Sequence, residues 1–235
     1  MEEHNLPQDI SKDPRVLMVE YSLKLLKDLT VNKKYKLPAS KEKTMEAIHK
    51  LNSLIKTIKY SYIMPLELVA NRMIKEFDLM ANQFWEAILK VDKDLKYNEL
   101  SAVELYFIFN ILKGFKERLK LGNEISLDKA VDIIAVRILS VSKLETTENL
   151  YRCRVGDGRR IIDIITNLKD IKKDTVVPAA ILPPRKFESE ISEAMFCSSQ
   201  DLPGMHGHVG ERILNLPESV LKEINHQIMD LMKDI

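Results

Sequence analysis

Between residues 131 and 199 the chain consists of short apolar runs separated by turn-forming residues, and this pattern constrains the fold more than any other feature. Glycine, proline or asparagine stands at most of the joints, and no segment with a helical period lies between the runs. The runs cover residues 131–141, 150–155, 160–165 and 176–182, and a last one centres on residues 194–197. Such a series predicts a small barrel of five short strands.

The residues within these runs resemble a known family. Residues 131–138 read Val-Asp-Ile-Ile-Ala-Val-Arg-Ile, and residues 149–155 read Asn-Leu-Tyr-Arg-Cys-Arg-Val. Ile-Ile-Thr-Asn-Leu at 164–168 stands in the place of an Ile-Val-Ser/Thr-Gly/Asn-Leu signature. Residues 177–186 and 192–195 supply an apolar strand, a basic turn and a Ser-x-Gly/Ala-Met strand. In this order the pieces resemble the tRNA-binding OB domains of the bacterial structure-specific tRNA-binding protein, of many methionyl-tRNA synthetase C-termini and of the endothelial-monocyte-activating polypeptide family.

Two departures from the family pattern concern charge. Asn149 stands where the family usually has a lysine or arginine before Leu-Tyr. The basic pair Arg185-Lys186 is followed by Phe-Glu-Ser-Glu, which adds Glu188 and Glu190 and removes the glycine of the family's turn. We therefore expect a weaker affinity for phosphate than in typical members.

The resemblance implies an OB-type barrel that binds tRNA by its shape and backbone. Arg152 and Arg154 share one face of a strand, and arginines near them can form a basic patch that gains affinity by counterion release. The candidate RNA-binding residues are Arg152, Arg154, Arg159, Arg160, Asn167, Arg185, Lys186 and Ser192. The alternative is that the arginines pair with Asp157, Asp163 and Glu148 on a solvated sheet face.

The N-terminal half of the chain has a helical pattern and contains no glycine before Gly114. Asp13 precedes a proline and Ser40 precedes an apolar stripe, so both are expected helix N-caps. A third helix is expected over residues 65–88, and a capping box at residues 101–104 predicts the start of a fourth. Four helices with short connections favour a bundle.

The tail adds one helix beginning near residues 216–219, after a loop over residues 200–214. The expected fold class is therefore α+β: an all-α helical bundle, then a five-stranded OB-type β-barrel, then a C-terminal helix. We expect two domains, residues 1–125 and residues 126–235.

Charge and motifs narrow the function. The formal net charge of +1 argues against strong nonspecific binding to nucleic acids. We find no phosphate-binding loop, dinucleotide-binding glycine pattern or nucleophile motif, and therefore expect no enzyme, no catalytic residue and no cofactor. His206 and His208 lie near Cys197 in sequence but lack the spacing of a zinc site, so no metal is expected.

Cellular location is suggested by the thiols and by hydropathy. Cys153 and Cys197 lie in apolar runs, which favours buried thiols in a reducing compartment. The first five residues are polar, and no apolar run reaches the roughly 18 residues of a membrane helix. We expect a soluble, cytoplasmic protein without membrane contact.

Two hypotheses about function remain. In the first, the barrel binds tRNA or structured RNA, and the helical region forms a homodimer or docks to an aminoacyl-tRNA synthetase. In the second, the barrel has lost most RNA affinity, as Asn149, Glu188 and Glu190 suggest, and the protein is an interaction adaptor. The chain also has a cluster of lysines that could extend the RNA-binding surface, but we interpret it as a solvated connector. This cluster comprises Lys24, Lys27, Lys33, Lys34 and Lys36.

Overall fold

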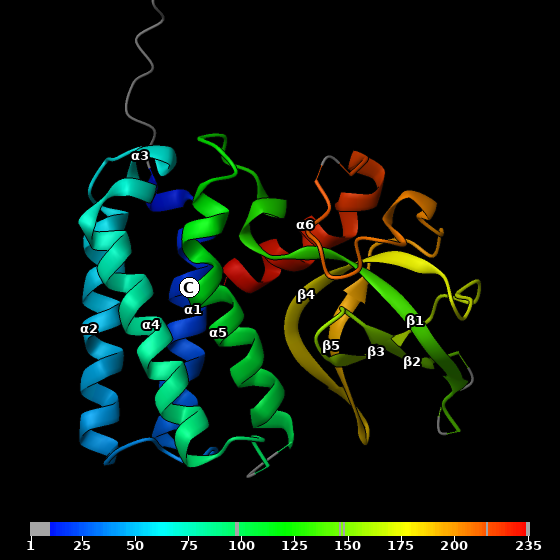
Figure 1. The fold of residues 1–235 in the computed structure, drawn as a ribbon, viewed down its shortest axis with the longest axis horizontal. Coiled ribbons are helices and arrows are strands. Elements are labelled where there is room, and N and C mark those ends of the chain that lie inside the picture. Colours follow the sequence, from blue (N-terminus) through cyan, green and yellow to red (C-terminus); the bar gives the residue numbers. More distant parts are fainter. Residues whose placement is uncertain (1–9, 97–98, 146, 148, 215, 234–235) are drawn as a thin grey trace, which may run out of the picture. The chain divides into compact units, whose positions relative to one another are not determined.

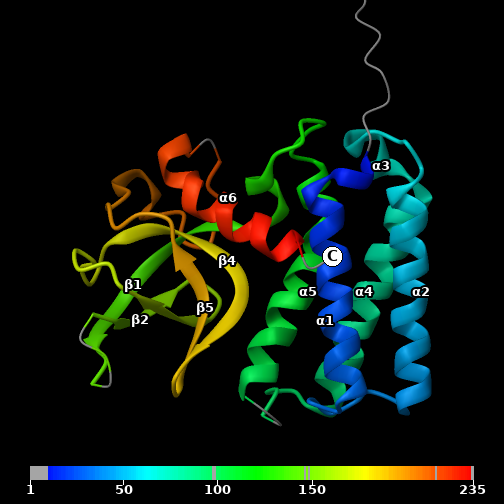
Figure 2. The same ribbon diagram turned by 180° about the vertical axis from the view of Figure 1, so that it is seen from behind.

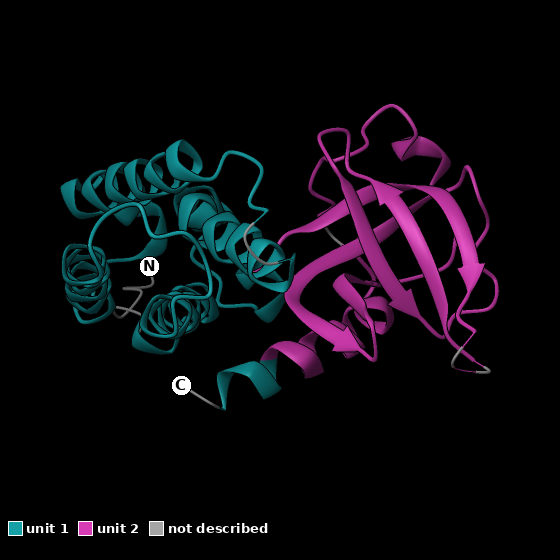
Figure 3. Ribbon diagram, turned by 90° about the horizontal axis from the view of Figure 1, so that it is seen from below, with its two compact units in different colours: residues 1–130, 229–235 teal, residues 131–228 magenta. Residues whose placement is uncertain are grey.

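The computed structural model describes residues 10–96, 99–145, 147, 149–214 and 216–233. It contains two compact units, Met1–Ala130 with Met229–Ile235, and Val131–Ile228 (Figure 3). Within the described residues, no helix combines the length and apolar character that a membrane crossing requires. We call the two parts the helical unit and the barrel unit.

The helical unit is a bundle of long helices (Figure 1). Its helices are α1 (Pro14–Val31), α2 (Lys41–Lys59), α3 (Pro65–Ala70), α4 (Arg72–Val91) and α5 (Glu99–Leu119). Helix α1 packs against α2 and α5, while α4 packs against α2 and α5. Edge-to-face ring pairs join α4 to α5, with centroids 5.7 Å apart for Phe77 and Phe115 and 5.6 Å apart for Phe84 and Phe109. Aromatic residues at helical spacing therefore form part of the bundle core.

Two of the expected helix starts are confirmed and two helix predictions are wrong. The Asp13 side chain accepts a hydrogen bond from the Arg15 backbone, and the Ser40 hydroxyl accepts one from Lys43. The helix expected over residues 65–88 is two helices, because Asn71 is extended and its side chain caps α4 at the amide of Met73. The capping box at residues 101–104 is wrong as well: α5 already begins at Glu99, which places Ser101 inside the helix.

The barrel unit contains one antiparallel sheet of five strands (Figure 2). The strands are β1 (Ile133–Lys143), β2 (Tyr151–Gly156), β3 (Ile161–Thr166), β4 (Val176–Phe187) and β5 (Glu190–Phe196), in the order β3-β2-β1-β4-β5. Helix α6 (Glu218–Met232) follows. The expected α+β class, with helices first, five strands next and a last helix, is confirmed.

The two edge strands β3 and β5 lie side by side without a ladder between them. The buried hydroxyl of Ser192 accepts a hydrogen bond from the Ile165 amide over 2.9 Å. One carboxylate oxygen of Glu193 accepts another from the Asp163 amide over 3.2 Å. Side chains of β5 thus satisfy the backbone of β3, which makes the sheet OB-like without closing it by strand pairing.

Strand β4 does not end at Pro183-Pro184, as the sequence predicted, but continues to Phe187. Its pairing with β5 shifts register between Ile181 and Arg185, and the prolines lie within this irregularity. Since proline has no amide to donate, a bulge is where a strand can tolerate it. Arg185 and Lys186 consequently lie within a strand, not in a turn.

The loop before α6 is fixed to the barrel by its backbone. The amides of Gly210 and Ile213 donate to the carbonyls of Ala135 and Ile133 over 2.8 Å each. Gly210 has a φ of +89°, and an added Cβ would collide with the backbone carbonyl of Asp157. The loop therefore pairs with the first residues of β1, ahead of the part that pairs with β2, and contacts the turn between β2 and β3.

Candidate nucleic-acid interface

The outer face of β2 carries two arginines. Arg152 and Arg154 alternate along the strand with the buried Cys153 and Val155, as the two-residue period of a strand requires. In OB folds the face of strands two and three is a common site for nucleic acids. The local backbone geometry therefore presents two guanidinium groups at a surface suited to phosphate contact.

Both arginines are paired with acidic residues of the same unit. A guanidinium nitrogen of Arg152 lies 2.7 Å from Asp163 and another lies 3.0 Å from Glu190. Arg154 lies 3.8 Å from Asp163 and keeps 53% of its side chain exposed. Asp163 is thus shared, and Arg154 is the looser of its two partners. Asp163 was one of the partners proposed from sequence, and Glu190 was not.

The other basic residues of the β2–β3 hairpin are arranged differently. Arg160 forms an ion pair with Glu193 of β5, a partner that no sequence pattern indicated. Asp157 accepts hydrogen bonds from the backbone amides of Arg159 and Arg160, and so shapes the turn. The Arg159 side chain is exposed at this turn. Glu148, the remaining acid considered as a partner, lies outside the described residues.

A hollow of about 270 Å³ lies beside the β3–β5 seam. Phe187 and Met195 contribute to its apolar wall, and Asn167 and Arg185 bring polar groups to it. Ser192 lines it too, but its hydroxyl already accepts from Ile165 and donates to the carbonyl of Ala194. The structure thus brings Asn167, Arg185 and Ser192 together.

The hollow and the outer face of β2 are neighbours. Arg152 is opposite Ile165 in the β2–β3 register, and Ile165 lines the hollow. Arg185 is opposite Ser192 on β5, while Lys186 is the next residue along β4 and is exposed. Arg159 lies at the far end of β2, beyond Gly156. A ligand on the arginine face can therefore reach the hollow without leaving the barrel unit.

The two free thiols have raised pKa values, and the two histidines of the loop before α6 lie beside carboxylates. Cys153 and Cys197 are free thiols, and burial raises their pKa to about 11 and about 12 respectively. His206 lies 2.9 Å from Asp201, and His208 lies 3.1 Å from Glu211. No group of three or more metal-ligating side chains occurs among the residues that the structure describes.

Comparisons with known proteins find family models that match parts of this chain. Residues 133–222 match the family model described as "Putative tRNA binding domain", and residues 8–122 match one described as an alpha helical domain. The resemblance to tRNA-binding domains found in the sequence is thereby confirmed for the C-terminal part of the chain.

A curated relative and a solved structure are also similar. The phenylalanine–tRNA ligase beta subunit of Thermotoga maritima is 29% identical over 104 residues, which are 40% of this chain and 13% of that protein. The chain thus spans about an eighth of that relative's length. The crystal structure of a MetRS-related protein from Pyrococcus horikoshii is 18% identical and covers 35% of this chain and 89% of its own, with a TM-score of 0.32.

Proposed function

We propose that this chain, whose residues 133–222 carry the domain of the tRNA-binding family, binds tRNA or similarly structured RNA through the barrel unit. The family match is the observation that carries the proposal. The arginine face and the adjoining hollow give it a physical basis. The proposed contact residues remain Arg152, Arg154, Arg159, Arg160, Asn167, Arg185, Lys186 and Ser192.

Phosphates would bind by replacing carboxylates. Exposed ion pairs contribute only about 0 to 1 kcal/mol each, so an RNA phosphate can compete for Arg154 without a large loss of stability. Arginine suits this exchange because its guanidinium can donate two parallel hydrogen bonds to a phosphate. Because a nearby carboxylate balances each of these arginines, they do not raise the formal net charge of +1. They could nevertheless bind RNA phosphates once the carboxylates are displaced.

The hollow has the chemistry to hold an unstacked base. Phe187 offers an aromatic wall, and the Asn167 amide and Arg185 guanidinium provide hydrogen-bonding groups. Ser192 would act by holding β5 against β3, since both hydrogen bonds of its hydroxyl lie within the barrel. We assign no catalytic role to these residues.

Several parts of the proposal extend to the whole molecule. The Thermotoga maritima relative is a subunit of a tRNA ligase, which supports tRNA as the RNA and a synthetase as a partner of this chain. A homodimer through the N-terminal helices or the C-terminal helix is part of the same proposal. Free thiols support a reducing compartment such as the cytoplasm.

A second candidate function is an interaction adaptor with little RNA affinity. It is favoured by one observation, the carboxylates of Asp163, Glu190 and Glu193 that engage the arginines of the barrel. These carboxylates would repel phosphates that do not displace them.

A salt-titrated binding assay with bulk tRNA and with duplex DNA of similar length separates the two functions. We expect tRNA to bind more tightly than DNA at every salt concentration, because the barrel recognises a folded shape in addition to charge. Equal and weak binding of both nucleic acids would instead support the adaptor.

A further inference from the structure

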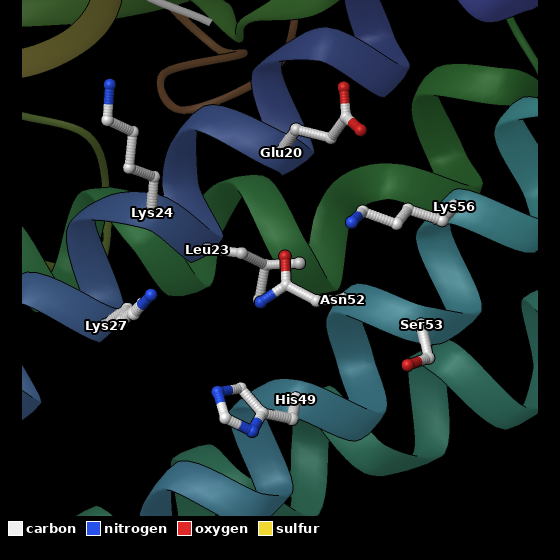
Figure 4. Close-up of a pocket in the computed structure, with 8 residues that line it drawn as sticks. All are labelled: Glu20, Leu23, Lys24, Lys27, His49, Asn52, Ser53 and Lys56. Carbon is white, nitrogen blue, oxygen red and sulfur yellow. The ribbon is translucent and has the colours of Figure 1, made fainter.

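The helical unit contains a second polar hollow, of about 400 Å³, between α1 and α2 (Figure 4). Its polar lining includes Lys24 and Lys27 of α1, and His49, Asn52, Ser53 and Lys56 of α2. Figure 4 shows His49, Asn52 and Lys56 of α2 directed into the space between the two helices. We call this hollow the α1–α2 groove.

Helical periodicity explains why these residues meet. On α2, positions 49, 52, 53 and 56 recur every three or four residues and therefore share one face. The adjoining face, with Ile48, Leu51 and Ile55, is buried in the bundle. The groove thus follows the polar border of the packed α1–α2 seam, and the fully buried Leu23 forms its floor.

The charge of the groove is positive. Its one acidic lining residue, Glu20, lies 2.7 Å from Lys59, and each of these two side chains is only 15% exposed. Among the described residues, neither Lys27 nor Lys56 lies within ion-pair distance of a carboxylate. Because Lys59 compensates Glu20, Lys27 and Lys56 remain available to an anion.

The shape and lining favour a phosphate chain over a peptide. From His49 to Lys56 the α2 face rises by about 10.5 Å, at 1.5 Å per residue. Consecutive phosphates of one strand lie farther apart in space than their rise of about 3.4 Å along a duplex axis, so a face of this length can contact a short stretch of backbone. An amphipathic peptide would need apolar pockets, whereas the apolar lining here is the buried floor residue Leu23.

We propose that the α1–α2 groove binds the phosphodiester backbone of RNA, as a contact separate from the barrel. Lys27 and Lys56 supply the charge, and Asn52 and Ser53 donate hydrogen bonds to phosphate oxygens. The inference rests on the proposed function in one respect, that the natural RNA is the tRNA bound by the barrel.

The first test compares two double variants of the full chain in salt-titrated tRNA binding. Lys27→Ala with Lys56→Ala should reduce the salt slope by about 1.5 units, since each lost contact removes roughly 0.7 to 0.9. The control, Lys43→Ala with Lys50→Ala, removes two exposed lysines of α2 that do not line the groove, and should leave the slope unchanged. Equal slopes in both variants would overturn the groove assignment.

A second test does not depend on tRNA binding. The ring signals of His49, assigned with His49→Gln and followed by NMR, should shift when oligouridine is added to the full chain. They should still shift in Arg154→Ala with Arg185→Ala, and should not shift in Lys27→Ala with Lys56→Ala. If His49 responds while tRNA fails to bind the wild type, the proposed function is wrong and the groove stands.

The remaining outcomes are equally decisive. If tRNA binds, but the His49 ring signals do not shift and the groove variant has the salt slope of the wild type, the groove inference is wrong and the proposed function stands. If polyglutamate of matched charge shifts His49 as strongly as oligouridine does, the groove is a general polyanion or acidic-peptide site, and the RNA assignment is overturned.

Discussion

Asp163 holds two arginines of the barrel face, at 2.7 Å for Arg152 and 3.8 Å for Arg154. This sharing makes Arg154 the residue that an incoming phosphate can recruit most readily, because its ion pair is longer and its side chain is half exposed. Arg152 also forms an ion pair with Glu190, so a phosphate would have to displace two carboxylates to bind it. At the level of single residues, we therefore expect phosphates to replace the carboxylate partner of Arg154 more easily than those of Arg152.

Gly210 tests how the loop before α6 is fixed to the barrel. In Gly210→Ala a side chain would occupy a left-handed backbone region and collide with the carbonyl of Asp157. We expect the free energy of unfolding to fall by about 1 to 3 kcal/mol, measured by denaturant titration. Gly204→Ala is the matched control, because a Cβ there meets nothing within 4 Å. An equal stability of the two variants would refute this account of the loop.

Among the elements, β3 and β5 stand out because hydrogen bonds from side chains, and not a backbone ladder, connect them. In Ser192→Ala the buried amide of Ile165 loses its acceptor. An unsatisfied buried donor costs about 1 to 3 kcal/mol, so the unfolding free energy should fall by that amount. Hydrogen exchange should also accelerate at Ile165. Ser189→Ala, in the exposed β4–β5 turn, is the control and should change neither quantity.

The strands of the barrel were predictable because each leaves a local signal, a β-branched run with turn residues at its ends. The end of β4 could not be predicted in this way. Pro183-Pro184 indicates the end of a strand, yet β4 continues through a bulge whose position depends on β5. Likewise, the break at Asn71 interrupts an apolar stripe that continues through it. These features are set by tertiary contacts, which outweigh local propensity.

The candidate site was predictable in part. The alternation of Arg152 and Arg154 with buried residues follows from the strand period. Their partner Glu190 and the Glu193–Arg160 pair join residues about 30 positions or more apart, and no sequence period indicates them. The site residues inferred from the family resemblance stay predictions, as does the synthetase partner.

For the whole molecule, the structure and the family models agree that a helical region precedes a barrel region. The domain limits 1–125 and 126–235 and the homodimer stay predictions. The central claim concerns the barrel: its arginines contact RNA phosphates, and do not serve only as partners for neighbouring carboxylates.

The salt dependence of tRNA binding by Arg154→Ala with Arg185→Ala tests this claim most directly. Both side chains are exposed, so the barrel should stay folded, and circular dichroism can verify this. A charge-matched control, Arg72→Ala with Lys222→Ala, removes two exposed cations outside the barrel face. We predict weaker tRNA binding and a salt slope lower by about 1.5 units, roughly 0.7 to 0.9 for each phosphate contact, in the barrel variant alone. An unchanged slope in a folded variant that still binds tRNA would contradict the account and place the RNA contact elsewhere.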